Sequence, residues 1–79
     1  VLAKEHFTKG NQHFAKGDII GAVAEFSLAI RKQPDYVLAI VNRGNLYTLQ
    51  KEYLLAMQDY NLAINYAPQS PQLYYNRAI

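Results

Sequence analysis

The chain has 79 residues, of which 51% are hydrophobic, and it carries a formal net charge of +2 at neutral pH. This length allows one small domain with a modest core, and the scattered cationic residues argue against nucleic acid as a partner. The absence of cysteine excludes disulfides and is compatible with a reducing compartment. The localisation is left unknown, with the cytoplasm favoured. No stretch approaches the roughly 20 apolar residues of a membrane span, so no membrane is expected as a partner either.

Helical periodicity and turn residues predict five helical segments, near residues 2–15, 19–32, 36–49, 53–66 and from 71 onward. Pro34 and Pro68 lack a backbone N–H and disfavour helix in the residue before them, so each is expected to end a helix. Ser70-Pro71 has the N-cap and first-position residues that are typical of a helix start. The sequence therefore predicts an all-α protein.

The loops after the first and third predicted helices differ at the position that determines the turn. In the first loop, Gly17 is expected in the left-handed conformation just past the helix, with Asp18 as the N-cap of the next helix. The second loop has Lys51 at the place of that glycine. Because the left-handed region is unfavourable for lysine, either Lys51 accepts a strained backbone or this turn has a different shape.

The chain also repeats itself at an offset of about 34 residues, the period of a helix-turn-helix solenoid unit. The repeated places carry a glycine, an alanine, an aromatic residue, a second alanine and a proline: Gly10, Ala22, Phe26, Ala29 and Pro34, then Gly44, Ala56, Tyr60, Ala63 and Pro68. The alanine-aromatic-alanine spacing puts these side chains on one stripe of a helix, which predicts a contact face. Glycine inside a helix costs about 1 kcal/mol relative to alanine, so a compensating close approach of two helices is expected at each glycine.

These residues resemble the signature of the tetratricopeptide repeat (TPR) family, and the resemblance covers nearly the whole chain. It implies an antiparallel helix-pair solenoid, the alpha-alpha superhelix, with repeat 1 at 3–36, repeat 2 at 37–70 and the first helix of a truncated repeat 3 at 71–79. The chain departs from the signature where His6 and Ile40 stand in place of a large aromatic residue. Since solenoids usually need about three repeats for stability, we expect the chain to be a fragment of a longer array.

No residue pattern is typical of an enzyme, a metal site or a cofactor site. His6 and His13 share a helix face, so a metal pair is conceivable, but each occupies a packing place in the repeat. Glu25 and Asp59 are interpreted as surface acids one period apart rather than as a catalytic pair. We expect neither catalysis nor a cofactor here, although a catalytic domain elsewhere in the parent protein stays open.

The cations Lys9, Arg43 and Arg77 recur at the repeat period and would stack in a solenoid. Their aliphatic stems are interpreted as covering the groove between repeats while the charges reach water. The alternative is an anion-binding ladder, which is disfavoured because phosphate binding needs more basic contacts than the chain offers.

The concave surface formed by the first helix of each repeat is the candidate binding site. Its expected lining is apolar or amide-bearing and comprises Phe7, Asn11, Phe14, Val41, Asn42, Asn45, Tyr75 and Asn76. A carboxamide can pair with both the N–H and the C=O of an extended peptide whatever its side chains are, and apolar neighbours then select side chains. The alternative for Asn42 and Asn45 is a scaffold role, through hydrogen bonds to neighbouring backbone.

Two subgroups of the TPR family narrow the expected partner. Domains that hold the acidic tails of heat-shock chaperones use two lysines, two asparagines and an arginine. Asn11 and Asn42 keep the asparagine places, but the cationic places hold Phe7, Gln72 and Asn76. An unpaired buried carboxylate is costly, so this resemblance argues against a chaperone acidic tail. Asn42 and Asn76 instead match a subgroup whose asparagine ladder grips peptide backbone.

Two functions therefore compete. In the first, the chain is a protein-protein interaction module that binds a peptide segment of its partner in the concave groove. In the second, it is a structural solenoid segment acting in self-association of its parent protein. An apolar face on the truncated last helix predicts weak self-association, because the free energy gained by burying it roughly balances the free-energy cost of association. This face comprises Leu73, Tyr74, Ala78 and Ile79.

Overall fold

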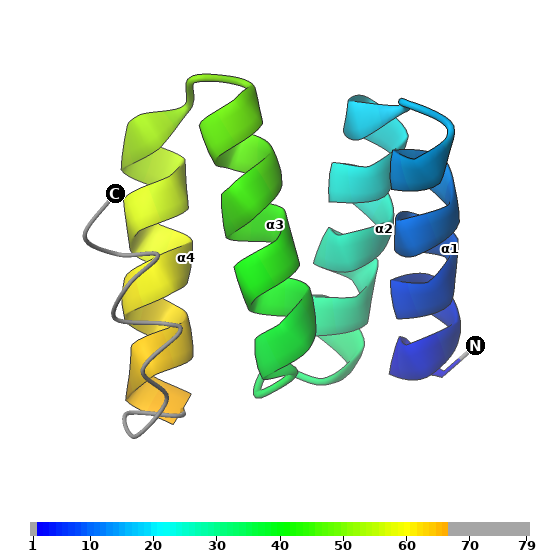
Figure 1. The fold of residues 1–79 in the computed structure, drawn as a ribbon. Helices are drawn as coiled ribbons and strands as arrows, with labels where there is room; N and C mark the ends of the chain where they lie inside the picture. Colours follow the sequence, from blue (N-terminus) through cyan, green and yellow to red (C-terminus); the bar gives the residue numbers. More distant parts are fainter. Residues whose placement is uncertain (1, 67–79) are drawn as a thin grey trace.

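A computed structural model of the chain describes residues 2–66, which form four α-helices (Figure 1). Their bounds are α1 Ala3–Ala15, α2 Ile19–Lys32, α3 Val37–Leu49 and α4 Tyr53–Tyr66. The first four predicted helices are confirmed to within one residue at each end, and α2 ends shortly before Pro34 as expected. The predicted fifth helix, with Ser70-Pro71 and the apolar face on it, lies outside the described residues, as does Pro68.

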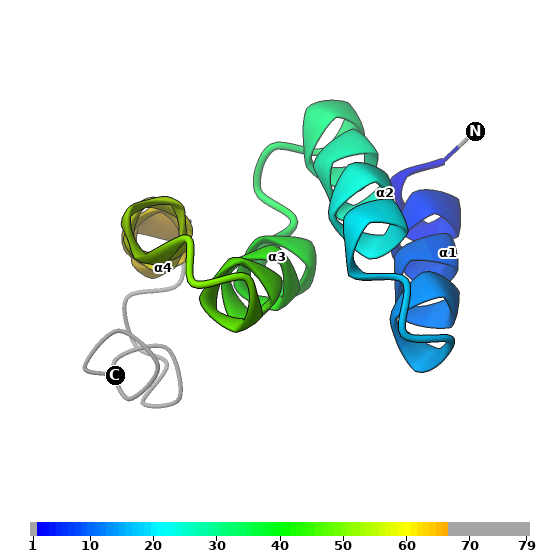
Figure 2. The same ribbon diagram turned by 90° about the horizontal axis from the view of Figure 1, so that it is seen from above.

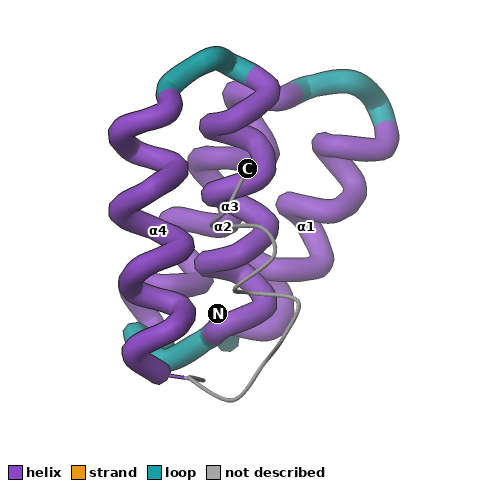
Figure 3. Tube along the Cα trace, turned by 60° about the vertical axis from the view of Figure 1, so that its left-hand side comes forward, coloured by secondary structure: helices purple, strands orange, loops and turns teal. Residues whose placement is uncertain are grey.

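Each helix packs mainly against its neighbours in the chain, α1 on α2, α2 on α3 and α3 on α4. Figure 1 shows the four helices as a row, and Figure 2 shows α2 displaced to one side of α1 and α3. Short loops join the helices (Figure 3), and residues 2–66 contain no strand. None of these four helices has the length and apolar character that a membrane crossing requires. Packing in chain order is the arrangement of an α-helical repeat solenoid, so the predicted fold class is confirmed.

Both repeated glycines lie directly against an aromatic ring of the following helix. A Cβ atom at Gly10 would lie 2.6 Å from the nearest ring atom of Phe26, and one at Gly44 would lie 2.8 Å from Tyr60. Both rings are buried. Since no methyl group fits at these distances, the predicted close approach at the two glycines is confirmed.

Two clusters of buried side chains hold the row of helices together. One joins α2 to α3 and consists of Ala22, Phe26, Ala29, Ala39 and Leu46. The other joins α3 to α4 and consists of Ile40, Val41, Ala63 and Ile64. Ile30 of α2 packs against both clusters, so the core continues from one helix pair into the next.

The loops after α1 and α3 share one backbone shape. Gly17 has a φ of 80° and Lys51 a φ of 62°, both in the left-handed region. Asp18 caps α2, because its Oδ1 accepts a hydrogen bond of 2.9 Å from the backbone N–H of Gly21. The predicted helix stop and N-cap are therefore confirmed, and Lys51 accepts the strained conformation.

Candidate functional site

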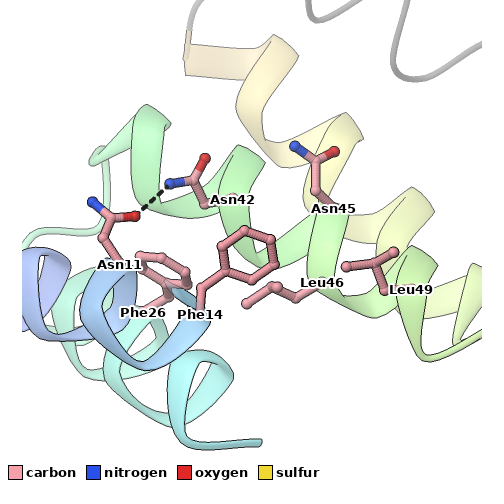
Figure 4. Close-up of a pocket in the computed structure, with 7 residues that line it drawn as sticks. All are labelled: Asn11, Phe14, Phe26, Asn42, Asn45, Leu46 and Leu49. Atoms are coloured by element: carbon pink, nitrogen blue, oxygen red, sulfur yellow. Dashed lines mark hydrogen bonds between the residues drawn. The ribbon is translucent and has the colours of Figure 1, made fainter. Parts of the chain in front are cut away.

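A hollow of about 210 Å³ opens between α1 and α3 (Figure 4). We call it the groove; its lining comprises Asn11 and Phe14 of α1, Phe26 of α2, and Asn42, Asn45, Leu46 and Leu49 of α3. Phe26 and Leu46 are buried and form its floor, whereas Phe14 and Leu49 are exposed. The groove thus combines an apolar floor and apolar sides with three carboxamides.

The three carboxamides follow one side of the groove in Figure 4. Asn42 donates from Nδ2 to Oδ1 of Asn11 at 3.4 Å, which connects α3 to α1. The hydroxyl of Tyr60 donates to Oδ1 of Asn45 at 2.6 Å. A carboxamide has two N–H donors and two acceptor lone pairs, so each asparagine keeps hydrogen-bonding capacity for a ligand.

Helical spacing brings these residues to one surface. Asn42, Asn45, Leu46 and Leu49 follow the i, i+3, i+4, i+7 pattern of a single stripe on α3. Asn11 and Phe14, three residues apart, share a face of α1. Asn11 and Asn45 directly follow the two glycines, which face the aromatic ring of the next helix. Each asparagine is therefore turned away from that helix-helix contact.

The structure brings four of the eight predicted site residues together in the groove: Asn11, Phe14, Asn42 and Asn45. Tyr75 and Asn76 lie outside the described residues, and the structure does not place them.

Phe7 packs against the core and Val41 belongs to it, and neither is among the residues that line the groove, which corrects their predicted place in the lining. The ring of Phe7 stacks on Tyr36, with the two ring centroids 5.1 Å apart, and also contacts the ring of Phe26. Val41 is 8% exposed and belongs to the cluster between α3 and α4. One helical position turns a side chain by about 100°, which is enough to move it from the groove to a neighbouring helix.

Leu49 lines the groove from its flank, and Leu46 and Phe26, neither of which the predicted lining includes, line it as well. The two leucines continue the stripe that begins at Asn42, so the helical period carries a signal for them. Phe26 reaches the groove from α2, and no pattern within one helix shows such a contact.

Asp59 and Arg43 are paired in the interior, contrary to the predicted surface acid and solvated cation. Asp59 is 3% exposed, and its two oxygens accept hydrogen bonds from Nε and Nη2 of Arg43 at 2.8 and 2.6 Å. Nη1 of Arg43 also donates to Oγ of Ser27 at 3.2 Å. The hydrogen bonds to Asp59 raise the pKa of the Arg43 guanidinium. Arg43 therefore holds helices together, and no charged side chain is among the residues that line the groove.

Each of the two histidines contacts an acid of its own. Nδ1 of His6 lies 2.8 Å from Oε1 of Glu25, and Nδ1 of His13 lies 3.0 Å from Oδ2 of Asp18. The hydrogen bond from the Gly21 backbone lowers the pKa of the Asp18 carboxyl, and His13 lowers it further. Glu25 of α2 is thus paired with His6 of α1 rather than being a free surface acid. Within residues 2–66, no group of three potential metal-ligating side chains is present.

Two known proteins are similar to this chain over most of its length, although no protein-family model matches it. Stress-induced-phosphoprotein 1 of Caenorhabditis elegans is 32% identical over 63 residues, which cover 80% of this chain and 20% of that protein. Mitochondrial import receptor subunit TOM70 of Homo sapiens is 31% identical over 70 residues, which cover 86% of this chain and 11% of that protein. The chain therefore corresponds to a small part of each relative.

Both relatives contain tetratricopeptide repeats. Together with four helices packed in chain order, these similarities support a TPR-like helical solenoid.

Proposed function

We propose that the chain is a member of the TPR family and that its groove binds an extended peptide segment of a partner protein. The observation that carries this proposal is the meeting of three carboxamides with apolar side chains at one hollow between α1 and α3. The amides suit the backbone of any peptide, and the apolar surface suits one bulky side chain.

The bound segment would place an apolar side chain between Phe14 and Leu49, on the floor made by Phe26 and Leu46. Burying a leucine-sized side chain there contributes about 1.5 to 3 kcal/mol. The amides would keep the peptide backbone hydrogen-bonded as it leaves water, which avoids a desolvation cost of about 1 to 3 kcal/mol for each group. The apolar contact thus supplies affinity, and the amides set the direction of the chain.

A segment without charge fits this groove best. A carboxylate placed against Phe14 and Leu49 would lose water without gaining a cation, because no charged residue lines the groove. We therefore propose that the acidic tail of a chaperone is not the partner, and a nucleic acid is disfavoured for the same reason. The human relative is by name a receptor subunit, and we propose receptor-like peptide binding rather than catalysis for this chain.

A second candidate, a structural segment that continues a longer array, is favoured by one face of α4. Ile19 and Val23 of α2 pack against the core. Their counterparts one period later, Tyr53 and Met57 of α4, are 63% and 42% exposed. We propose repeats at 3–36 and 37–70, with 71–79 beginning a third, and this face as the place where the array or a second copy continues.

Peptide binding can be tested by selecting a binder from a displayed library of random ten-residue peptides and measuring its affinity by calorimetry. Asn42→Ala combined with Asn45→Ala should weaken the selected peptide roughly 30-fold, since each lost contact contributes about 1 kcal/mol. Asn61→Ala combined with Asn65→Ala removes two exposed amides of α4 outside the groove and is the matched control. An equal affinity for the two double variants would show that Asn42 and Asn45 have a structural role and do not contact the ligand.

A further inference from the structure

Asn45 is held at the groove by a residue of the next helix. The Tyr60 hydroxyl of α4 lies 2.6 Å from Oδ1 of Asn45, and the tyrosine is 7% exposed. Asn45 itself is exposed and lines the groove. A buried, well-packed ring therefore holds one end of an exposed carboxamide.

The Tyr60 hydroxyl lies against the oxygen end of the Asn45 amide. A separation of 2.6 Å suits an O–H···O hydrogen bond, whereas N–H···O bonds in proteins are about 2.7 to 3.2 Å long. The hydroxyl of Thr48, 3.3 Å from that of Tyr60, donates to the backbone oxygen of Gly44 at 3.1 Å. The Thr48 hydroxyl can therefore only accept from Tyr60, and its contact is the longer one. An amide oxygen cannot donate, so the Tyr60 hydroxyl donates to Oδ1 of Asn45 across the shorter distance of 2.6 Å. In Figure 4 the amide nitrogen of Asn45 lies on the side of Asn42.

The first repeat contains the same arrangement without the hydroxyl. Phe26 lies against Gly10 just as Tyr60 lies against Gly44, and Asn11 follows Gly10 just as Asn45 follows Gly44. Because Phe26 has no hydroxyl, it cannot orient Asn11. The amide of Asn11 instead accepts from Asn42, at the longer distance of 3.4 Å. The fold therefore accepts either phenylalanine or tyrosine at this place, and the hydroxyl of Tyr60 is available for another role.

We infer that Tyr60 is a positioning residue that makes the Asn45 end of the groove selective for hydrogen-bond acceptors. Tyr60 takes one lone pair of Oδ1 and holds that oxygen toward α4, so Asn45 turns its two N–H groups toward the groove and a ligand. A carbonyl oxygen of a peptide satisfies this position, and a backbone N–H does not. This inference rests on the proposed function, since it specifies which backbone group of the bound peptide meets Asn45.

The first arm of the test needs no ligand. In carbon-13 NMR spectra of the 79-residue chain, Tyr60→Phe should shift the Cγ resonance of Asn45 upfield, because a carbonyl that loses a hydrogen-bond donor becomes more shielded. Tyr66→Phe removes a hydroxyl from another, half-exposed tyrosine of α4 and should leave this resonance in place. An Asn45 Cγ resonance that does not move in Tyr60→Phe overturns the inference, whatever the groove binds.

The second arm uses N-acetyl-leucine-N-methylamide as the probe, because it carries one apolar side chain between two peptide groups. Titration should move the Nδ2 proton resonances of Asn45 in the wild-type chain. Asn45→Asp keeps the shape and still accepts from Tyr60, but it places an acceptor where donors stood, so affinity should fall at least tenfold. Tyr60→Phe lets the amide adopt either orientation, which should weaken binding about twofold if half of the molecules remain competent.

The outcomes separate this inference from the proposed function. Probe binding that survives Asn45→Asp unchanged overturns the acceptor selectivity but leaves peptide binding in place. Binding that is lost in Asn45→Asp but is equal in the wild type and Tyr60→Phe keeps the Asn45 contact and overturns the positioning role of Tyr60. A wild-type chain whose groove resonances do not respond to the probe rejects both proposals, even if the Cγ shift occurs.

Discussion

Arg43 of α3 and Asp59 of α4 form a two-point ion pair, in which Nε and Nη2 each donate to one carboxylate oxygen, at 2.8 and 2.6 Å. Such parallel bonds fix the relative orientation of the two side chains. Because Nη1 also reaches Ser27 of α2, one guanidinium joins three helices and spans the boundary between the two helix pairs.

We predict that Arg43→Met lowers the free energy of unfolding by about 3 kcal/mol, because the Asp59 carboxylate stays buried without its cation. Arg43→Met combined with Asp59→Leu should recover a large part of this loss, since no buried charge then remains. Urea denaturation followed by circular dichroism measures both variants. If the double variant is no more stable than the single one, the loss comes from packing rather than from the orphaned charge.

We predict that Gly10→Ala and Gly44→Ala each destabilise the chain despite the higher helix propensity of alanine. Propensity alone would add about 1 kcal/mol. The new methyl group would lie 2.6 Å from the Phe26 ring or 2.8 Å from the Tyr60 ring, and overpacking typically costs about 1 to 3 kcal/mol. Ala24→Gly, at an exposed position of α2, isolates the propensity effect. Thermal melting of all three variants gives the sign, and a raised melting temperature in Gly10→Ala would refute the tight crossing.

We predict that Lys51→Gly stabilises the chain by about 0.5 to 1 kcal/mol. The left-handed conformation costs a non-glycine residue about 1 to 2 kcal/mol, and the greater freedom of glycine in the unfolded chain offsets part of that gain. Gly17→Ala, the reverse change at the matching loop, should destabilise through the backbone alone, because nothing lies within 4 Å of an added Cβ there. Chemical denaturation of the two variants should therefore move the midpoint in opposite directions. Equal shifts of one sign would contradict the shared turn shape.

We predict that the charge of Asp18 stabilises the chain above the ordinary pKa range of aspartate and ceases to do so in acid. The Gly21 N–H lowers the pKa of Asp18 in the folded chain, so the folded state favours the charged form. This contribution is lost as the pH falls through the lowered pKa. Asp18→Asn keeps a good N-cap without the charge.

Melting temperatures of the wild type and Asp18→Asn, measured from neutral pH into the acid range, check this dependence. The wild type should be the more stable at neutral pH, and the difference should vanish in acid. Because His13 faces Asp18 at 3.0 Å, Asp18→Asn is also measured with His13→Gln in both chains. A difference that stays constant with pH would show that Asp18 acts only through its shape.

The sequence by itself determined the helices, their order and the contacts that recur with the repeat. A glycine facing an aromatic residue, an alanine stripe and a glycine-aspartate turn depend on local backbone geometry and on a face that every repeat must bury. Such features follow from residue type and period, and they hold for Gly10 with Phe26, for Gly44 with Tyr60 and for Gly17 with Asp18.

Only the tertiary structure decided what the longer and polar side chains contact. The helical period leaves open whether Asp59 meets water or Arg43, whether Phe7 lines the groove or stacks on Tyr36, and which end of Asn45 is held by Tyr60. The reason is physical. A polar or aromatic side chain takes its partner from another helix, and that choice depends on distances of a few tenths of an ångström and on desolvation, which the spacing of residues along one helix does not contain.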